Sequence, residues 1–270
     1  MTIQTLESPS ITEHDIEAVL LDNDPESLEL LKQFYDGLLV AAFPDPKIRD
    51  KYESMVLSLN QNHGDIKNFP EGDHRYNVLL LRQGEHMIGG FAYDYLSGKS
   101  RLSERRHDIV FAEYSVVDKE HRQRGYSLLG IRYREEHAQA LAQRNGRKLE
   151  AVLSEIEDPE KMTKEEIAKE IMDPYARREW AQHLGYRALD FDYVQPILLG
   201  RRETSRNLTL VIKPLVEQWT EEQRIPSADV AGMLDVRVQR DKRYPHRSST
   251  FRQMRSDIMS RSYIQLKDLI

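Results

Sequence analysis

Cysteine is absent from all 270 residues of the chain. Disulfide bonds, a cysteine nucleophile and thiolate metal sites are therefore excluded, and a reducing cytoplasm is the expected location. No apolar run approaches the length of a membrane-spanning helix, and the first residues lack the basic start and apolar core of a secretory signal. We therefore expect a cytoplasmic protein with no membrane partner.

Neither sign of charge is in large excess, because 39 lysines and arginines face 45 aspartates and glutamates, a formal net charge of −6. This balance argues against a nucleic-acid partner and is compatible with a cationic amine substrate. The nine histidines do not have the spacing of metal ligands. The segment Ser97-Gly-Lys-Ser100 resembles the end of a P-loop, but Tyr93 stands where the first glycine would be, so a turn is the better interpretation.

The first half of the chain predicts a strand, two helices and then a hairpin. A short strand is expected at 17–21. Helices are expected to begin at Asp24-Pro25 and at Asp45-Pro46, because aspartate is a good N-cap and proline suits the first helical position. Two strands at 76–81 and 86–95 are joined by a glycine-containing turn, which indicates a hairpin.

The second half alternates between strands and helices. Strands are expected at 108–117 and 148–156, parallel to each other because a helix crosses between them. Further helices are expected at 163–171 and from Asp173-Pro174 to His183, followed by strands at 190–199 and 207–213. The tail beyond residue 215 has helical patterns at 228–238 and 250–266, and could form a lid, a docking face or a homodimer arm.

The stretch from Val117 to Ser127, V-D-K-E-H-R-Q-R-G-Y-S, is the most informative in the chain. A β-branched and aromatic segment precedes it, and a helical pattern that ends at Asn145-Gly146 follows it. The first amides of a helix have no intrahelical partner and lie at the positive end of its dipole, so they can bind an anion. Gly125 allows a close approach to the backbone, and Arg122 and Arg124 add positive charge. The pattern predicts a phosphate site.

This stretch resembles motif A of the GNAT superfamily, the acyl-CoA-dependent N-acyltransferases. In that motif a strand ending in Val is followed by Arg or Gln, two residues, Gly, one residue, and Gly or Ala, and then by a helix. Arg122, Gly125 and Ser127 occupy the three motif positions, and Val117 lies five residues before Arg122. Ser127 departs from the usual Gly or Ala, although its hydroxyl could bond a phosphate oxygen.

A second local match lies at the end of the late helix. Many GNAT members have an aromatic residue, Tyr, two polar residues, Leu, Gly and an aromatic residue there, and Trp180-Ala-Gln-His-Leu-Gly-Tyr186 agrees at the aromatic, Leu, Gly and final aromatic positions. Ala181 stands where a tyrosine often serves as general acid. The usual proton donor to the departing thiolate is therefore missing from this position.

The resemblance implies an α/β fold, with a mixed, mostly antiparallel central sheet, a splayed parallel strand pair and helices on both faces. It would cover residues 1–215 as the acyltransferase domain and leave 216–270 as a helical C-terminal extension. It also implies acetyl-CoA as co-substrate, with the pyrophosphate on the loop and the pantetheine arm along the end of the motif strand. The residues expected to bind coenzyme A are Ser115, Val116, Val117, Arg122, Gln123, Arg124, Gly125, Tyr126 and Ser127.

Acyl transfer to an amine also needs a base, because a free amine has a pKa of about 10 and is protonated at neutral pH. Glu113, four residues before Val117 on the same strand face, is the first candidate, unless it pairs with Arg101, Arg105 or Arg106. Glu155 on the adjacent strand is the second. Two such carboxylates could instead select a cationic acceptor, with neither acting as base. Tyr175 is the available phenol for the acid.

The sequence thus predicts a coenzyme A-dependent N-acetyltransferase acting on an amine-bearing small molecule or peptide by direct attack. A GNAT-like fold that binds acyl-CoA as a sensor or assembly module is the first alternative, because Ala181 replaces the usual tyrosine. A nucleic-acid or phospho-ligand binder is the second, but its basic residues are interleaved with acidic ones.

Overall fold

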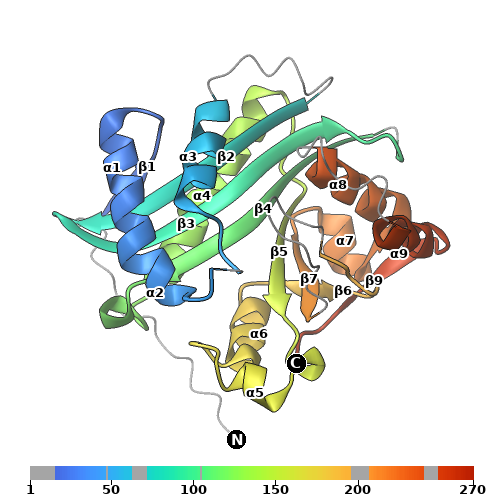
Figure 1. The fold of residues 1–270 in the computed structure, drawn as a ribbon. Coiled ribbons are helices and arrows are strands. Elements are labelled where there is room, and N and C mark those ends of the chain that lie inside the picture. Colours follow the sequence, from blue (N-terminus) through green and yellow to red (C-terminus); the bar gives the residue numbers. More distant parts are fainter. Residues whose placement is uncertain (1–15, 47, 63–71, 104, 196–206, 240–248) are drawn as a thin grey trace, which may run out of the picture. The chain divides into compact units, whose positions relative to one another are not determined.

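The computed structural model describes residues 16–46, 48–62, 72–103, 105–195, 207–239 and 249–270 (Figure 1). Its strands hydrogen-bond in the order β1-β2-β3-β4-β5-β7-β6-β9-β8. The chain divides into two compact units. The first consists of Met1–His63, Tyr76–Tyr93 and Tyr114–Ala138, and the second of Gly64–Arg75, Asp94–Glu113 and Gln139–Ile270.

The strands are β1 (Glu17–Leu20), β2 (Gly72–Gln83), β3 (His86–Lys99), β4 (Arg106–Val117), β5 (Ala151–Glu157), β6 (Arg187–Leu189), β7 (Leu208–Pro214), β8 (Arg224–Pro226) and β9 (Tyr263–Lys267). The α-helices are α1 (Pro25–Phe34), α2 (Val40–Ala42), α3 (Tyr52–Gln61), α4 (Tyr126–Arg144), α5 (Lys164–Ile167), α6 (Pro174–His183), α7 (Glu217–Glu222), α8 (Ser227–Gln239) and α9 (Ser249–Met259). Of the strand pairs with a described register, only β4 and β5 are parallel, which confirms the predicted mixed sheet.

Helix α1 begins where the sequence predicts. The Asp24 carboxylate accepts hydrogen bonds from the amides of Glu26 and Ser27, at 2.9 and 3.1 Å, and Pro25 occupies the first turn. The chain then continues as a π-helix from Tyr35 to Leu39 and as the short helix α2.

The prediction that the second helix begins at Asp45-Pro46 is wrong, since α3 begins at Tyr52. Asp45 instead closes a turn, in which its carbonyl accepts a hydrogen bond from the amide of Ile48 at 3.1 Å. The guanidinium of Arg49 donates to the carbonyls of Phe43 and Pro44 at 2.7 and 3.0 Å. These contacts stabilise a turn that competes with the local helix signal.

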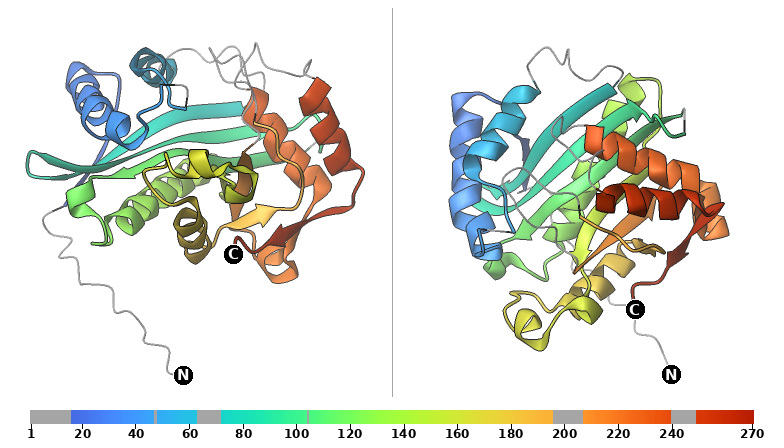
Figure 2. Two further views of the ribbon diagram at one scale, coloured as in Figure 1. Left: turned by 60° about the horizontal axis from the view of Figure 1, so that its bottom comes forward. Right: turned by 45° about the vertical axis from the view of Figure 1, so that its right-hand side comes forward.

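In the first unit, two neighbouring residues of β3 show how helices cover both faces of the strands (Figure 2). A Cβ added at Gly90 would lie 2.4 Å from the ring of Phe34 on α1, whereas the Phe91 ring packs against Gly130 of α4. Successive strand residues point to opposite faces, so α1 and α4 lie on opposite sides. The core on the α1 side contains Leu21, Leu30, Leu31, Phe34, Leu39, Met55, Leu59, Tyr76, Val78, Leu80, Ala92, Tyr114 and Val116.

The second unit is built around the parallel pair β4 and β5. Ile109 to Ala112 pair with Ala151 to Ser154, and β5 pairs along its other edge with β7 from Ala151 to Glu157. The predicted strand at 190–199 is not found in its described part, because β6 covers only 187–189 and residues 190–195 form no strand. Residues 196–199 lie outside the described ranges. The side chains of Tyr193 and Gln195 bond Glu155 instead.

The tail contains the expected helices and two strands that the sequence analysis missed. Helix α8 agrees with the predicted 228–238, but α9 ends at Met259 and the rest of the predicted helix is strand β9. Side chains of α8, α9 and β9 share one core with Ile109 and Phe111 of β4 and with Leu153 of β5. The boundary between the two compact units does not lie at residue 215. The predicted division into a domain of residues 1–215 and an extension of residues 216–270 stays a prediction.

None of the helices in the described ranges is both long and apolar enough to cross a lipid bilayer.

The contact between Gly130 and Phe91 predicts a measurable loss of stability on Gly130→Ala. Alanine alone would favour a helix interior by about 1 kcal/mol. Here the added Cβ would lie 2.0 Å from Cε2 of Phe91, a ring with no solvent exposure. We expect a net destabilisation of about 1–3 kcal/mol in urea unfolding. Gly37→Ala is the control, because nothing lies within 4 Å of its added Cβ. Equal effects at the two positions would contradict this packing.

Candidate functional site

The segment between β4 and α4 folds as a tight loop held from both ends. At its start the amide of Asp118 donates to the carbonyl of Ile88 on β3 at 2.8 Å, and a single 3-10 turn follows from Lys119 to His121. The Arg122 side chain turns back, and its Nε donates to the carbonyl of Val117 at 3.2 Å. The motif arginine therefore ties the loop to the strand end, a role that the sequence pattern does not reveal.

Two residues of the loop adopt left-handed backbone angles, Gln123 with φ of 62° and Gly125 with φ of 82°. Glycine adopts this conformation without steric cost, whereas a residue with a Cβ pays roughly 1–2 kcal/mol. Strain of this kind collects at functional sites, where the surrounding structure holds it. The two reversals direct the chain into α4.

The first amides of α4 are open. The first backbone bond into the helix runs from the amide of Leu129 to the carbonyl of Gly125 at 3.1 Å. Within the described residues, the amides of Arg122 to Leu128 donate to no backbone or side-chain acceptor. Arg122, Gln123 and Arg124 are exposed, and Gly125, Tyr126 and Ser127 are half-buried. Donors at the positive end of a long helix can bind a phosphate group.

Strand β4 extends beyond its ladder with β5. The described register pairs of the two strands end at Ala112 and Ser154, while β4 continues to Val117. Of the three residues expected to bond pantetheine, Ser115 is exposed, and Val116 and Val117 are buried. The role of their backbone in binding pantetheine stays a prediction.

Glu113, the first candidate base, is the residue that follows the last β4 partner of β5. Its Oε1 lies 3.7 Å from a terminal nitrogen of Arg237 on α8. The partners expected from the sequence are Arg101, Arg105 and Arg106. Arg237 is not among them, because a contact across more than a hundred residues has no local signal. Arg105 is used elsewhere, since it donates to Glu150 and to Asp229 at 2.8 and 3.0 Å.

Glu155, the second candidate, follows the last β5 partner of β4. The buried side chains of Tyr193 and Gln195 both donate to it, the latter with 2.5 Å between Nε2 and Oε2. The Tyr193 hydroxyl is therefore directed at a carboxylate. The segment after β6 thus brings a phenol to the strand end, a contact that the sequence analysis did not predict.

The remaining acid candidate has a different environment. Tyr175 begins α6 with its side chain 53% exposed, and its hydroxyl makes no hydrogen bond with the described residues. Ala181, at the position of the missing tyrosine, is buried. Tyr175 as general acid stays a prediction.

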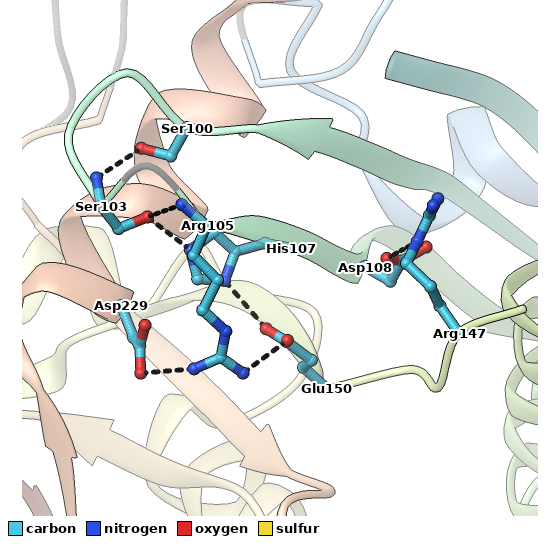
Figure 3. A network of polar contacts seen from close by, with 8 residues as sticks. All are labelled: Ser100, Ser103, Arg105, His107, Asp108, Arg147, Glu150 and Asp229. Atoms are coloured by element: carbon cyan, nitrogen blue, oxygen red, sulfur yellow. Dashed lines mark hydrogen bonds and ion pairs between the residues drawn. The ribbon is translucent and has the colours of Figure 1, made fainter. Parts of the chain in front are cut away.

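At the other end of β4, several charged and polar side chains bind one another in a network (Figure 3). These contacts account for their presence without a catalytic role. His107, fully buried, contacts Glu150 through Nδ1 at 2.8 Å and Ser103 through Nε2 at 3.0 Å. A Cβ at Gly232 of α8 would lie 2.4 Å from Nε2 of His107, so the helix backbone closes over this pair. The network joins the β3-β4 connection, β4, the residue before β5, and α8.

A neighbouring group is centred on Asp108. Arg147 donates to this carboxylate at 2.5 Å, which raises the pKa of the arginine. Tyr95 also donates to Asp108 at 2.5 Å, and burial together with this bond raises the pKa of the phenol to about 12. Neither group is therefore ready to exchange a proton near neutral pH.

Among the described residues, no cluster of three histidine or carboxylate side chains is placed to hold a metal ion.

Comparisons with known proteins give structural matches only. No protein-family model matches the chain, and no curated protein matches it by sequence. An IAA acetyltransferase from Bacillus cereus is 13% identical, with a TM-score of 0.38 over 74% of this chain and 99% of that chain. An acetyltransferase from Streptococcus agalactiae is 10% identical, with a TM-score of 0.41 over 74% and 99%. NAA60 from Arabidopsis thaliana, in complex with acetyl-CoA, is 13% identical, with a TM-score of 0.45 over 74% and 98%.

Proposed function

We propose that the protein is an acyl-CoA-dependent N-acyltransferase of the GNAT superfamily that transfers an acetyl group from acetyl-CoA to an amine. The observation that supports this most directly is the open row of amides from Arg122 to Leu128 at the start of α4. A diphosphate needs several donors at once, and consecutive backbone amides beside arginines provide them. Backbone groups of Ser115 to Val117, beyond the end of the ladder with β5, would bond the pantetheine arm.

The reaction that we propose is direct attack of a neutral amine on the thioester carbonyl. The carbon–nitrogen bond forms, the carbon–sulfur bond breaks, and the amine proton passes to a carboxylate, while the departing thiolate receives a proton. Glu113 is our first choice for the base and Glu155 the second, since each follows the last residue that pairs β4 with β5. Tyr175 remains the proposed proton donor, and an amine-bearing small molecule or a peptide is the proposed acceptor.

One observation favours a second function. Both candidate carboxylates already have partners, Arg237 for Glu113 and the pair Tyr193 and Gln195 for Glu155. The groups that already contact these carboxylates compete with an incoming amine for the carboxylate oxygens. This arrangement, together with Ala181, suits a protein that binds acyl-CoA as a sensor or assembly module and does not turn it over.

Release of free thiol from acetyl-CoA in the presence of an amine panel tests the two functions. The enzyme is expected to release thiol with at least one amine, above the rate without amine. Calorimetric binding of coenzyme A without turnover of any amine would support the sensor. Absence of coenzyme A binding would contradict both.

Gly125→Glu is expected to abolish coenzyme A binding, because it adds bulk and negative charge at the proposed pyrophosphate site. Gly146→Glu is the matched control at the other end of α4. Gly146 also has a positive φ, 68° against 82° for Gly125, so both variants carry similar backbone strain. Calorimetry should show binding lost in the first variant and kept in the second. Normal binding by Gly125→Glu would show that the loop is assigned wrongly.

Glu113→Gln is expected to lower kcat by about 10²–10⁴-fold, the usual contribution of a general base, with coenzyme A affinity kept. The amide cannot accept the amine proton, whereas its shape preserves the strand. The pH dependence of kcat/KM should lose its acidic limb in this variant. A rate that is unchanged across pH would transfer the role to Glu155 or to water, and Glu155→Gln then becomes the test.

A further inference from the structure

The guanidinium of Arg237 is a largely buried charged group in the second unit. Its side chain is only 12% exposed, and its Nε is buried without a hydrogen-bond partner. In the described part of the chain, none of its nitrogens makes a hydrogen bond at all. Buried polar groups are nearly always hydrogen-bonded, and each exception needs an explanation such as a bound water or ligand.

The groups around Arg237 hold it in place without satisfying its N–H donors. Its two terminal nitrogens lie 3.8 Å from Asp94 and 3.7 Å from Glu113, which is beyond hydrogen-bond distance. Its carbon Cζ lies 4.1 Å from the ring centroid of Phe111, a cation–π contact. Asp94, fully buried, is also bonded by Nε2 of His74 at 2.9 Å. The plane of the guanidinium is thus fixed by a ring and two carboxylates.

The two terminal nitrogens differ from Nε in one respect. They make no hydrogen bond, yet only Nε is among the buried nitrogens that have no partner. The terminal nitrogens therefore retain some exposed surface within a side chain that is 12% exposed, and their N–H groups form a planar fork between Asp94 and Glu113. A planar fork of this kind matches the two oxygens of a carboxylate.

We propose that Arg237 binds a carboxylate of the acceptor, so that the acceptor is an amine that also carries a carboxylate, as in a free amino acid. This proposal rests on the proposed acyltransferase function and deepens it. The acceptor ammonium lies against Glu113, and its carboxylate lies on the guanidinium beside it. The opposite charges of such a zwitterion match the opposite charges of the two side chains, which lie 3.7 Å apart.

The charge pattern favours a carboxylate over a phosphate. Asp94 and Glu113 both lie within 4 Å of Arg237. A doubly charged phosphate would be repelled by both carboxylates more strongly than a singly charged group. An amine without an anionic group would leave the donors of Arg237 unsatisfied, which lowers its transition-state binding.

Matched pairs of acceptors test the proposal. The pairs are tyrosine and tyramine, histidine and histamine, and lysine and cadaverine, in which each second member lacks the carboxylate. Thiol release from acetyl-CoA is expected to give a kcat/KM at least tenfold higher for the carboxylated member of at least one pair. Equal or better use of the decarboxylated members, or no use of any carboxylated member, would overturn the proposal.

Arg237→Lys removes the fork and keeps the charge. We expect the preference for the carboxylated member to fall at least tenfold, mainly through KM. A purely structural role would lower kcat/KM for both members by the same factor, and that result would overturn the proposal. Arg224→Lys is the control, because Arg224 also stacks on a ring, Tyr263, with Cζ 4.2 Å from its centroid, and pairs with Glu222. The Arg224→Lys variant should prefer the carboxylated acceptor to the same degree as the wild type.

Coenzyme A binding separates failure of this proposal from failure of the proposed function. If the wild type binds coenzyme A and acetylates only decarboxylated amines, the proposed acyltransferase function is supported and the proposed carboxylate-binding role of Arg237 is wrong. If it binds no coenzyme A, the proposed acyltransferase function is itself wrong. The thermal midpoint of each variant shows whether the fold is kept.

Discussion

The parallel pairing of β4 and β5 is the constraint on which the proposed chemistry depends. Two parallel strands cannot be joined by a tight turn, so the chain has to cross from the end of one to the start of the other. Helix α4 makes this crossing, and a single loop, residues 118–125, separates its first turn from the end of β4. The loop between them is short, held by the bond from Arg122 to the carbonyl of Val117 and bent by two left-handed residues. The open amides result from this connection.

The tail, residues 216–270, does more than pack against the rest of the second unit. Its helix α8 places Arg237 beside Glu113 and Phe111, and Gly232 of the same helix closes over His107. Both contacts are made to β4 or to the residues that lead into it. A residue from the tail can thereby set the charge around a carboxylate on the strand of the proposed reaction. In the proposed enzyme, one helix would therefore contribute both to acceptor specificity and to packing.

Much of the architecture could be predicted because its signals are local. The caps at Asp24 and Asp173, the hairpin turn at Gly84 and the loop at Gly125 all depend on backbone chemistry within a few residues. The failures have tertiary causes. Asp45-Pro46 has the same local signal as Asp24-Pro25, but Arg49 stabilises a turn there. Ile264 and Leu266 alternate with the polar Gln265 and Lys267, a strand signal that the helical interpretation overlooked.

The same distinction between local signals and tertiary contacts applies to the candidate site. The loop residues follow from a pattern in one stretch of chain, whereas the partners of Glu113 and Glu155 come from segments far away in sequence. No periodicity indicates that residue 237 will face residue 113. Part of the chemistry of a carboxylate is therefore decided by packing, which a single sequence does not display.

The pairing of β6 with β9 has a consequence for synthesis in the cell. Ala188 and Leu189 pair with Lys267 and Leu266, and β9 also pairs with β8. While a ribosome is still elongating the chain, β6 can meet β7 but has no partner on its other edge. That edge remains exposed until the codons for residues 263–267 have been translated and the segment has left the exit tunnel. The second unit can therefore complete its sheet only after this late segment has been made, although β6 and β7 precede it by some fifty residues or more.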